Sequence, residues 1–246
     1  MDFTLNKYSE LLQALTTSGK KFSLRHDVDL KPENSLATAR IESQHGLQAT
    51  YYFRAVPESW NERIIKEISA LGHEIGYHYE CLTTCNGNME LAWKDFKKNL
   101  KDLRRLAPVN KICMHGSPRS KWDSKDLWKK YDYRSQGIDY EPYLDTDYTH
   151  ALYLTDTGRR WDGWKVSVRD KIPEWQGKWQ EQGLVFHTTD EIIQWLKSNN
   201  IPQHLTTIYI TTHPQRWSNN PILWLKELVM QNLKNIVKAI LVRKQK

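Results

Sequence analysis

The chain has 246 residues, of which 39% are hydrophobic and 26% charged, and its formal net charge is +7. A chain of this length buries a sufficient core without disulfides, and its three cysteines are too few for a disulfide framework. The sequence shows neither a signal-like segment nor an apolar run of membrane-spanning length, so we expect a cytoplasmic protein with no membrane span. Its basic residues are spread along the chain, which argues against nucleic acid as a partner.

Helix and strand patterns alternate through the first half of the chain. Residues 22–29 alternate apolar and polar side chains as a strand does, and Pro32 and Gly46 are typical of the start and the end of the next helix. Ser59 and Glu62 form a capping-box pattern before a further helix, which ends at Gly72. Further strands are expected at 49–55, 74–79, 111–115, 151–155, 164–168 and 206–211, and further helices at 89–107, 189–199 and after Pro221. This alternation predicts a parallel sheet or a β/α barrel, and the absence of any linker predicts one domain over residues 1–246.

Polar side chains follow several of these predicted strands at the point where each strand ends. In a strand, residues two apart point to the same face, so Asp27 with Asp29, and His78 with Glu80, can converge. Functional groups in parallel β/α folds gather at the carboxyl ends of strands. Six residues are therefore candidates for one site: Asp27, Asp29, His78, Glu80, His115 and His213. His26 and His73 are expected to lie in the core or behind the site.

The motifs around the first three strands resemble those of a known family. The string Ala49-Thr-Tyr-Tyr-Phe53, followed by Gly72-His-Glu-Ile-Gly-Tyr-His78, resembles the polysaccharide deacetylase (NodB-homology, carbohydrate esterase 4) superfamily. The resemblance covers residues 20–80 and continues only at His115-Gly-Ser-Pro118 and Thr212-His213-Pro214. The Arg25-His-Asp-Val-Asp29 form is similar to a divergent branch associated with bacterial surface-polysaccharide and O-antigen biosynthesis. The resemblance to this superfamily implies that the fold is a distorted (β/α) barrel of about seven parallel strands.

The resemblance also implies roles for single residues. Asp27 matches the catalytic base, His213 the general acid and His78 the first metal-binding histidine. Val28 occupies the place of the metal-binding aspartate, so Asp29 is the expected substitute. Leu82 occupies the place of the second metal-binding histidine, so either Glu80 or His115 must replace it. Asp29, His78, Glu80 and His115 are thus the expected ligands of a divalent ion, with zinc the expected metal and other first-row ions also compatible.

Three further residues are expected to bind the substrate. Nine of the eleven tryptophans follow residue 120, and Trp161 and Trp217, beside charged residues in predicted loops, suit stacking against sugar rings. Core packing is the alternative for these tryptophans. Arg25 is assigned to substrate binding as well, with an ion pair to Asp27 as the alternative.

Together these residues predict a metal-dependent hydrolase that removes an N- or O-acetyl group from a sugar of a surface-polysaccharide precursor. A metal would polarise the acyl group, a carboxylate would accept a proton and an imidazole would donate one. The basic charge suits a nucleotide-linked or lipid-linked sugar. Two alternatives remain open: hydrolysis of another C–N amide bond on the same fold, and a carbohydrate-binding scaffold without a metal.

Overall fold

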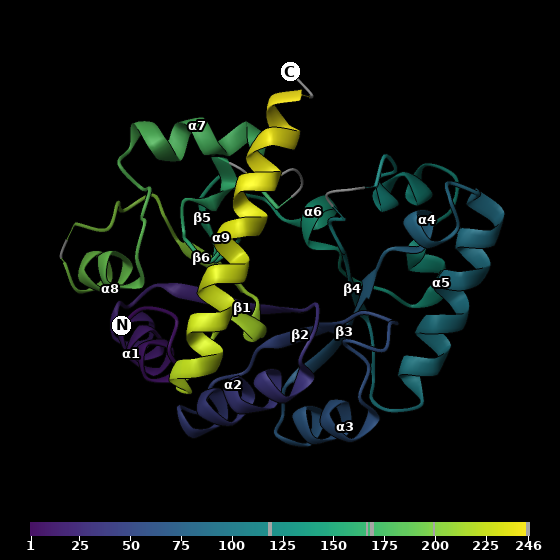
Figure 1. The fold of residues 1–246 in the computed structure, drawn as a ribbon, viewed down its shortest axis with the longest axis horizontal. Coiled ribbons are helices and arrows are strands. Elements are labelled where there is room, and N and C mark those ends of the chain that lie inside the picture. Colours follow the sequence, from purple (N-terminus) through teal and green to yellow (C-terminus); the bar gives the residue numbers. More distant parts are fainter. Residues whose placement is uncertain (118–119, 166, 168–169, 199, 245–246) are drawn as a thin grey trace.

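The computed structural model describes residues 1–117, 120–165, 167, 170–198 and 200–244. At its centre is a parallel sheet of six strands in the order β4-β3-β2-β1-β6-β5, curled into a half-barrel (Figure 1). The strands are β1 (Lys21–Val28), β2 (Thr50–Phe53), β3 (Glu74–Tyr79), β4 (Lys111–Met114), β5 (Ala151–Thr155) and β6 (Thr207–Thr212).

The predicted α/β class is correct, whereas the expected seven strands are not found in the described part of the chain. The strand expected at 164–168 accounts for part of the difference. Trp164 lies in a 3-10 turn, Gly163–Lys165, and residues 166 and 168 lie outside the described residues. Within the described ranges β4 and β5 are the two edges of the sheet, so the sheet does not close into a barrel there.

Helices connect the strands and cover the outside of the curled sheet. The helices are α1 (Leu5–Thr17), α2 (Pro32–Gln44), α3 (Glu62–Ala70), α4 (Cys81–Thr84), α5 (Met89–Arg104), α6 (Pro142–Asp145), α7 (Pro173–Glu181), α8 (Thr189–Lys197) and α9 (Pro221–Lys244). Helix α9, yellow in Figure 1, crosses the face of the molecule and ends beyond the other elements. Among the described residues, none of these helices combines the length and the apolar character that crossing a bilayer requires.

The end of β1 is held by a residue whose role the sequence pattern did not predict. Asn61, not Ser59, caps α3 by accepting a hydrogen bond from the Ile64 amide. The hydroxyl of Ser59 instead donates to the Val28 carbonyl at 2.5 Å and accepts from the Arg54 amide at 3.0 Å. Since this hydroxyl bridges the ends of β1 and β2, it fixes the point at which the polar residues after β1 leave the sheet.

The outer face of β1 carries a buried polar network instead of a purely apolar surface. Glu42 on α2 is fully buried and accepts hydrogen bonds from His26 Nε2 at 2.6 Å, from the Tyr51 hydroxyl at 2.6 Å and from the Tyr8 hydroxyl. His26 Nδ1 faces the Thr212 hydroxyl on β6 at 2.7 Å. These bonds tie α2, β1 and β6 together, because a buried carboxylate is tolerated only when its oxygens are satisfied. The prediction that His26 lies in the core is confirmed.

Candidate active site

The sheet order brings polar side chains together at the carboxyl ends of five strands. All six strands, in the order β4-β3-β2-β1-β6-β5, are parallel to their neighbours, so their carboxyl ends point the same way. The side chains that meet there come from the ends of β1, β3, β4, β5 and β6: Asp27, Asp29, His78, Glu80, His115, Asp156 and His213. Each of these seven residues lies at least 35 positions along the chain from a partner in the cluster, so the cluster forms only when the chain folds.

Asp29, His78 and His115 form a group with the geometry of a metal site. Asp29 Oδ1 lies 3.6 Å from His78 Nε2 and 3.5 Å from His115 Nε2. The three potential ligand atoms lie within 4.8 Å of one another. Asp29 Oδ1 is buried without a hydrogen-bond partner, whereas Oδ2 accepts from the Gln215 amide at 3.3 Å. A buried carboxylate oxygen facing two imidazole nitrogens fits a divalent cation between them.

The other ring nitrogen of each histidine is held by an acceptor. His78 Nδ1 donates to the Cys113 carbonyl at 2.9 Å, and His115 Nδ1 donates to Glu80 Oε2 at 2.9 Å. Because a carbonyl or carboxylate oxygen here can only accept, each ring carries its proton on Nδ1 and presents the Nε2 lone pair toward Asp29. Such bonds to the far nitrogen orient histidine ligands in many metal sites.

Glu80, which was expected among the ligands, lies behind His115. Its Oε1 accepts from Arg54 Nε at 2.9 Å and Nη2 at 2.7 Å, while Oε2 takes the bond from His115. Burial alone would raise the pKa of Glu80, but His115 and Arg54 together lower it to about 2. Both carboxylate oxygens are therefore engaged, and the described geometry brings His115 rather than Glu80 to Asp29 and His78.

The electrostatics of Asp29 agree with this grouping. Its side chain is largely buried, and burial alone would raise its pKa. The facing His115, His78 and His213 outweigh that effect and hold the pKa of Asp29 well below its usual range. The carboxylate is therefore charged at neutral pH and available to a cation.

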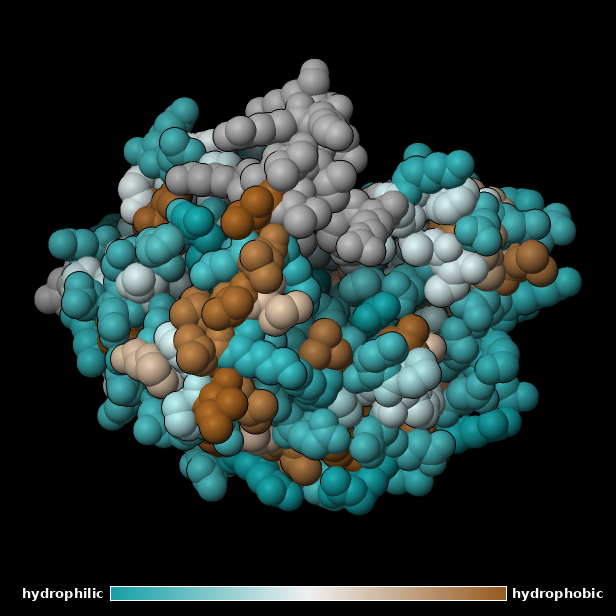
Figure 2. Space-filling view, in the orientation of Figure 1, coloured by the Kyte–Doolittle hydropathy of each residue, from teal (hydrophilic) through white to brown (hydrophobic). Residues whose placement is uncertain are grey.

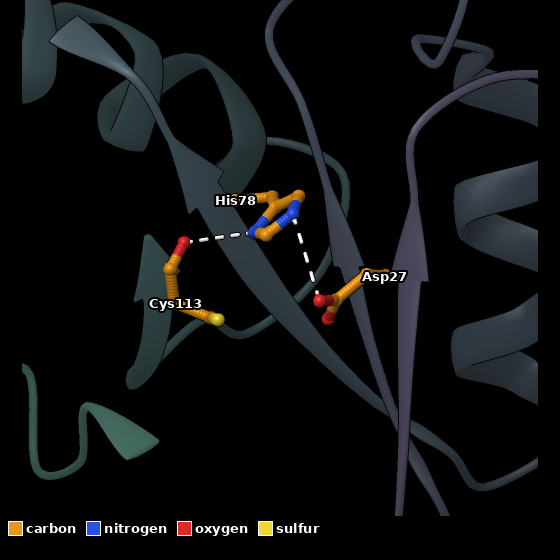
Figure 3. A group of neighbouring side chains, drawn as sticks. All are labelled: Asp27, His78 and Cys113. Carbon is orange, nitrogen blue, oxygen red and sulfur yellow. Dashed lines mark hydrogen bonds and ion pairs between the residues drawn. The ribbon is translucent and has the colours of Figure 1, made fainter. Parts of the chain in front are cut away.

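Asp27 lies beside this group and is held by Arg25 on the same face of β1. Arg25 Nε donates to Asp27 Oδ1 at 2.8 Å and Nη2 to Oδ2 at 2.6 Å, and both side chains are buried. Burial alone would raise the pKa of Asp27, yet Arg25 and His78 lower it to about 2. Figure 3 shows Asp27 facing His78, with Asp27 Oδ2 at 3.8 Å from His78 Nε2. Asp27 is thus ionised beside the ligand group.

Cys113 belongs to a second trio with Asp27 and His78, which Figure 3 shows. This trio is the weaker candidate for a metal, because Arg25 occupies both oxygens of Asp27. The Cys113 thiol is fully buried, and burial raises its pKa well above the usual value. A neutral thiol is a poor ligand, since metal binding requires the thiolate.

His213 reaches the opposite side of Asp29, with its Nε2 at 3.9 Å from Asp29 Oδ2. Its Nδ1 donates to Asp156 Oδ1 at 2.6 Å, and its backbone amide donates to Asp156 Oδ2 at 3.0 Å. Asp156 also accepts from Arg216 Nη1 at 2.5 Å and from Trp217 Nε1 at 2.9 Å. Burial would raise the pKa of Asp156, but Arg216 and His213 keep it below its usual value. An ionised carboxylate therefore orients His213.

Sequence reasoning missed three of these supporting residues: Asp156, Arg54 and Arg216. Asp156 follows directly after the expected strand at 151–155, so the rule that polar residues after strands share an edge could have identified it. Arg54 likewise follows β2. No periodicity marks Arg216, which lies in the 3-10 turn Pro214–Arg216.

The residues assigned to substrate binding lie in the interior. Trp161 is 3% exposed and Trp217 is 1% exposed, and both rings pack against Phe3. Their indole nitrogens donate to Thr189 and Asp156, so these side chains are core residues and do not offer a face to a sugar. Arg25, 8% exposed, forms the ion pair with Asp27 that was its alternative role. The burial of both tryptophans favours core packing, which was their alternative, whereas the assignment of Arg25 to substrate binding stays a prediction.

Comparisons with known proteins give similar structures but no similar sequence. No protein-family model matches the chain, and no curated protein does. A carbohydrate esterase 4 enzyme of Streptococcus mutans superposes with a TM-score of 0.45 at 16% identity, covering 91% of this chain and 86% of that one. The polysaccharide deacetylase Bc1974 of Bacillus cereus gives 0.44 at 11%, covering 87% and 88%. A pseudoenzyme of carbohydrate esterase family 4 from Bacillus anthracis, BA3943, gives 0.42 at 15%, covering 87% and 61%.

Proposed function

We propose that this protein is a metal-dependent hydrolase that removes an acetyl group from a sugar. The observation that carries the proposal is the trio of Asp29, His78 and His115, in which one buried carboxylate oxygen without a hydrogen-bond partner faces two imidazole nitrogens. Because an open site with three protein ligands is typical of catalytic zinc, zinc is the first ion to test, with other first-row ions as competitors.

His115 takes the place of the missing second histidine in this proposal, and Glu80 supports it. The distance from His115 Nδ1 to Glu80 Oε2, 2.9 Å, makes Glu80 the group that orients the ring. When bound, the divalent ion would polarise the acyl carbonyl and lower the pKa of a water molecule. The remaining chemistry would fall to the side chains around it.

Asp27 is the proposed general base. It lies next to the ligand group, and the Arg25 guanidinium keeps it ionised and fixes the direction of both oxygens. His213 is the proposed general acid. Asp156 holds the Nδ1 proton, so Nε2 is the nitrogen that can deliver a proton to the departing amine or alcohol. Asp27 and His213 thus flank Asp29 with opposite roles.

The acetylated sugar is proposed from the resemblance of residues 20–80 to the polysaccharide deacetylase superfamily, and the divergent Arg25-His-Asp-Val-Asp29 form favours a surface-polysaccharide precursor. The net charge of +7 favours a phosphate-bearing form, nucleotide-linked or lipid-linked. Hydrolysis of a different C–N amide would use the same groups. A metal-free binding scaffold would leave Asp29 Oδ1 to its ion pairs with His78 and His115, so zinc binding distinguishes this alternative from the hydrolase.

Acetate release from a panel of acetylated nucleotide sugars tests the proposal, with zinc added and then removed by a chelator. The Asp27→Asn variant should bind zinc with unchanged stoichiometry and lose turnover by at least about a hundredfold, the lower range for a general base. Asp147→Asn is the matched control. Asp147 is exposed and precedes β5, so it lies at the amino ends of the strands, away from the candidate site. Full turnover by Asp27→Asn, or full activity of the chelated protein, would refute the mechanism.

A further inference from the structure

Helix α9 exposes an apolar face that nothing in the described structure covers. Of the ten large hydrophobic side chains exposed in the described part of the chain, seven lie on this helix, and their exposed fractions run from 45% to 76%. They are Ile222, Leu223, Leu225, Val229, Met230, Leu233 and Ile236. Figure 2 shows them as a brown stripe along the helix. Most are spaced three or four residues apart, so they share one face of the helix.

The opposite face of α9 is fastened to the body of the protein, so the apolar face is turned outward. Trp224 Nε1 donates to the Asp2 carbonyl at 2.6 Å, and Asn235 Nδ2 donates to the Gly158 carbonyl at 2.8 Å. Lys31 forms an ion pair with Glu227 at 3.3 Å. These hydrogen bonds and this ion pair attach one side of α9 to the rest of the protein. Rotating the helix so that the apolar stripe faced inward would break them.

The charges of α9 indicate what kind of partner would cover the stripe. Lys226 and Lys234 are exposed on the helix, and its one acidic residue, Glu227, is mostly buried and paired with Lys31. A second copy of this face would bring lysines against lysines with no free carboxylate to compensate. A surface that is both apolar and negatively charged satisfies the apolar side chains and the ammonium groups together.

We propose that α9 binds an anionic lipid surface, with its apolar stripe in the boundary between headgroups and acyl chains. Lys226 lies within the stripe, and its four-carbon stem can follow the apolar surface while the ammonium group reaches the phosphates. An interfacial helix of this kind combines apolar burial with attraction to anionic lipids. The proposal does not depend on the proposed reaction.

The position of α9 relates this surface to the candidate active site. Lys31, which binds α9, follows Asp29 by two residues, and Gly158 follows Asp156 by two. The helix is therefore fastened to the two loops that carry a metal-ligand candidate and the partner of His213. If the proposed function holds, a bound α9 brings these loops to the membrane, which favours the lipid-linked form of the acetylated sugar.

Cosedimentation of the full chain with lipid vesicles tests the proposal. Vesicles with about 30% phosphatidylglycerol should bind the protein, and vesicles of phosphatidylcholine alone should bind it far less. Leu225→Ser and Val229→Ser together should weaken binding more than about tenfold, since each removes an exposed apolar side chain that the membrane would bury. Leu91→Ser is the matched control, because Leu91 on α5 is 52% exposed and Leu225 is 55% exposed. It should leave binding unchanged.

A further variant tests the electrostatic contribution to membrane binding. Lys226→Gln should reduce binding to the anionic vesicles about fivefold, the effect of one cation near a charged membrane, and should reduce the dependence on salt. Circular dichroism verifies that each variant is folded. Equal binding to neutral and anionic vesicles, or no binding to either, would overturn the proposal. So would a dimer in light scattering that Leu225→Ser dissociates. Vesicle binding needs neither metal nor substrate, so its failure leaves the proposed hydrolase untouched.

Discussion

Arg25 and Asp27, two residues apart on β1, form a buried ion pair closed by two hydrogen bonds of 2.8 and 2.6 Å. The arginine also lies over the rings of Tyr52 and Tyr143, at 5.7 and 5.1 Å from their centroids. The guanidinium therefore cannot move away without losing several partners. The base candidate and the group that holds it come from a single strand, so no other loop needs to close for Asp27 to be aligned.

Arg25→Gln should destabilise the protein strongly, because it leaves the charge of Asp27 buried without a counter-ion. Breaking a buried pair in this way costs about 3–5 kcal/mol of the free energy of unfolding. Urea unfolding of the apoprotein at pH 7 measures the effect. The double variant Arg25→Gln/Asp27→Asn should recover part of that loss, since it removes both charges. A double variant no more stable than Arg25→Gln alone would contradict the buried-pair interpretation.

Metal affinity should separate the roles of His115 and Glu80. His115→Gln removes one proposed ligand and should abolish tight zinc binding. Glu80→Gln keeps the acceptor for His115 but removes its charge, and should weaken zinc about 10–100-fold, as loss of a ligand-orienting partner does. Titration calorimetry with zinc measures both. Equal loss in the two variants would make Glu80 a ligand itself, and His187→Gln, on a histidine outside the cluster, serves as control.

Asp156→Asn should slow the reaction without removing zinc. The Asp156 carboxylate accepts a hydrogen bond from His213 Nδ1, which leaves Nε2 facing the site. The amide of asparagine can donate to Nδ1 instead and hold the wrong tautomer of the ring, so turnover should fall at least about a hundredfold. Turnover and zinc stoichiometry, measured on the same preparation, check this. Unchanged turnover would remove His213 from the role of acid.

The apoprotein should lose stability in acid, and Asp27 should account for part of that loss. The folded-state pKa of Asp27 is about 2, below its ordinary 3.8. A lowered pKa contributes stability that is fully present above the unfolded value and disappears as the pH falls through the folded value. For Asp27 the window is roughly pH 4 to 2, and the contribution is about 2 kcal/mol. Urea unfolding at pH 6 and pH 2.5, for the wild type and Asp27→Asn, should show a smaller acid loss in the variant. Equal losses would show that Asp27 has no depressed pKa.

The sequence predicted much of the fold, because hydrophobic periodicity and the glycine and proline positions determined most elements locally. The strand at 151–155 and the helices before Gly46 and Gly72 formed where their patterns indicated. The predictions that failed concern contacts between segments that are far apart in the sequence. Ser59 matched a capping box, yet its hydroxyl bonds to the Val28 carbonyl, since that contact depends on the approach of two strands.

The site was predictable where a residue type and a strand end coincided. Asp27, Asp29, His78 and His213 converge because parallel strands share one edge. The choice between His115 and Glu80 was not predictable, because it depends on which side chain Arg54 engages. The tryptophans misled for a related reason: charged neighbours in the sequence suggested exposure, whereas Trp217 is buried against Phe3 and bound to Asp156.

The two faces of β1 carry different sets of polar residues, and this matters for recognising distant relatives. Arg25 and Asp27 serve the inner face, and His26 joins Glu42 and Thr212 on the outer one. Moving this segment by a single position would exchange the two sets. Polar residues at the alternate positions 25, 27 and 29 are therefore the pattern by which distant relatives should be sought. A search that demands two adjacent aspartates would pass over proteins built this way.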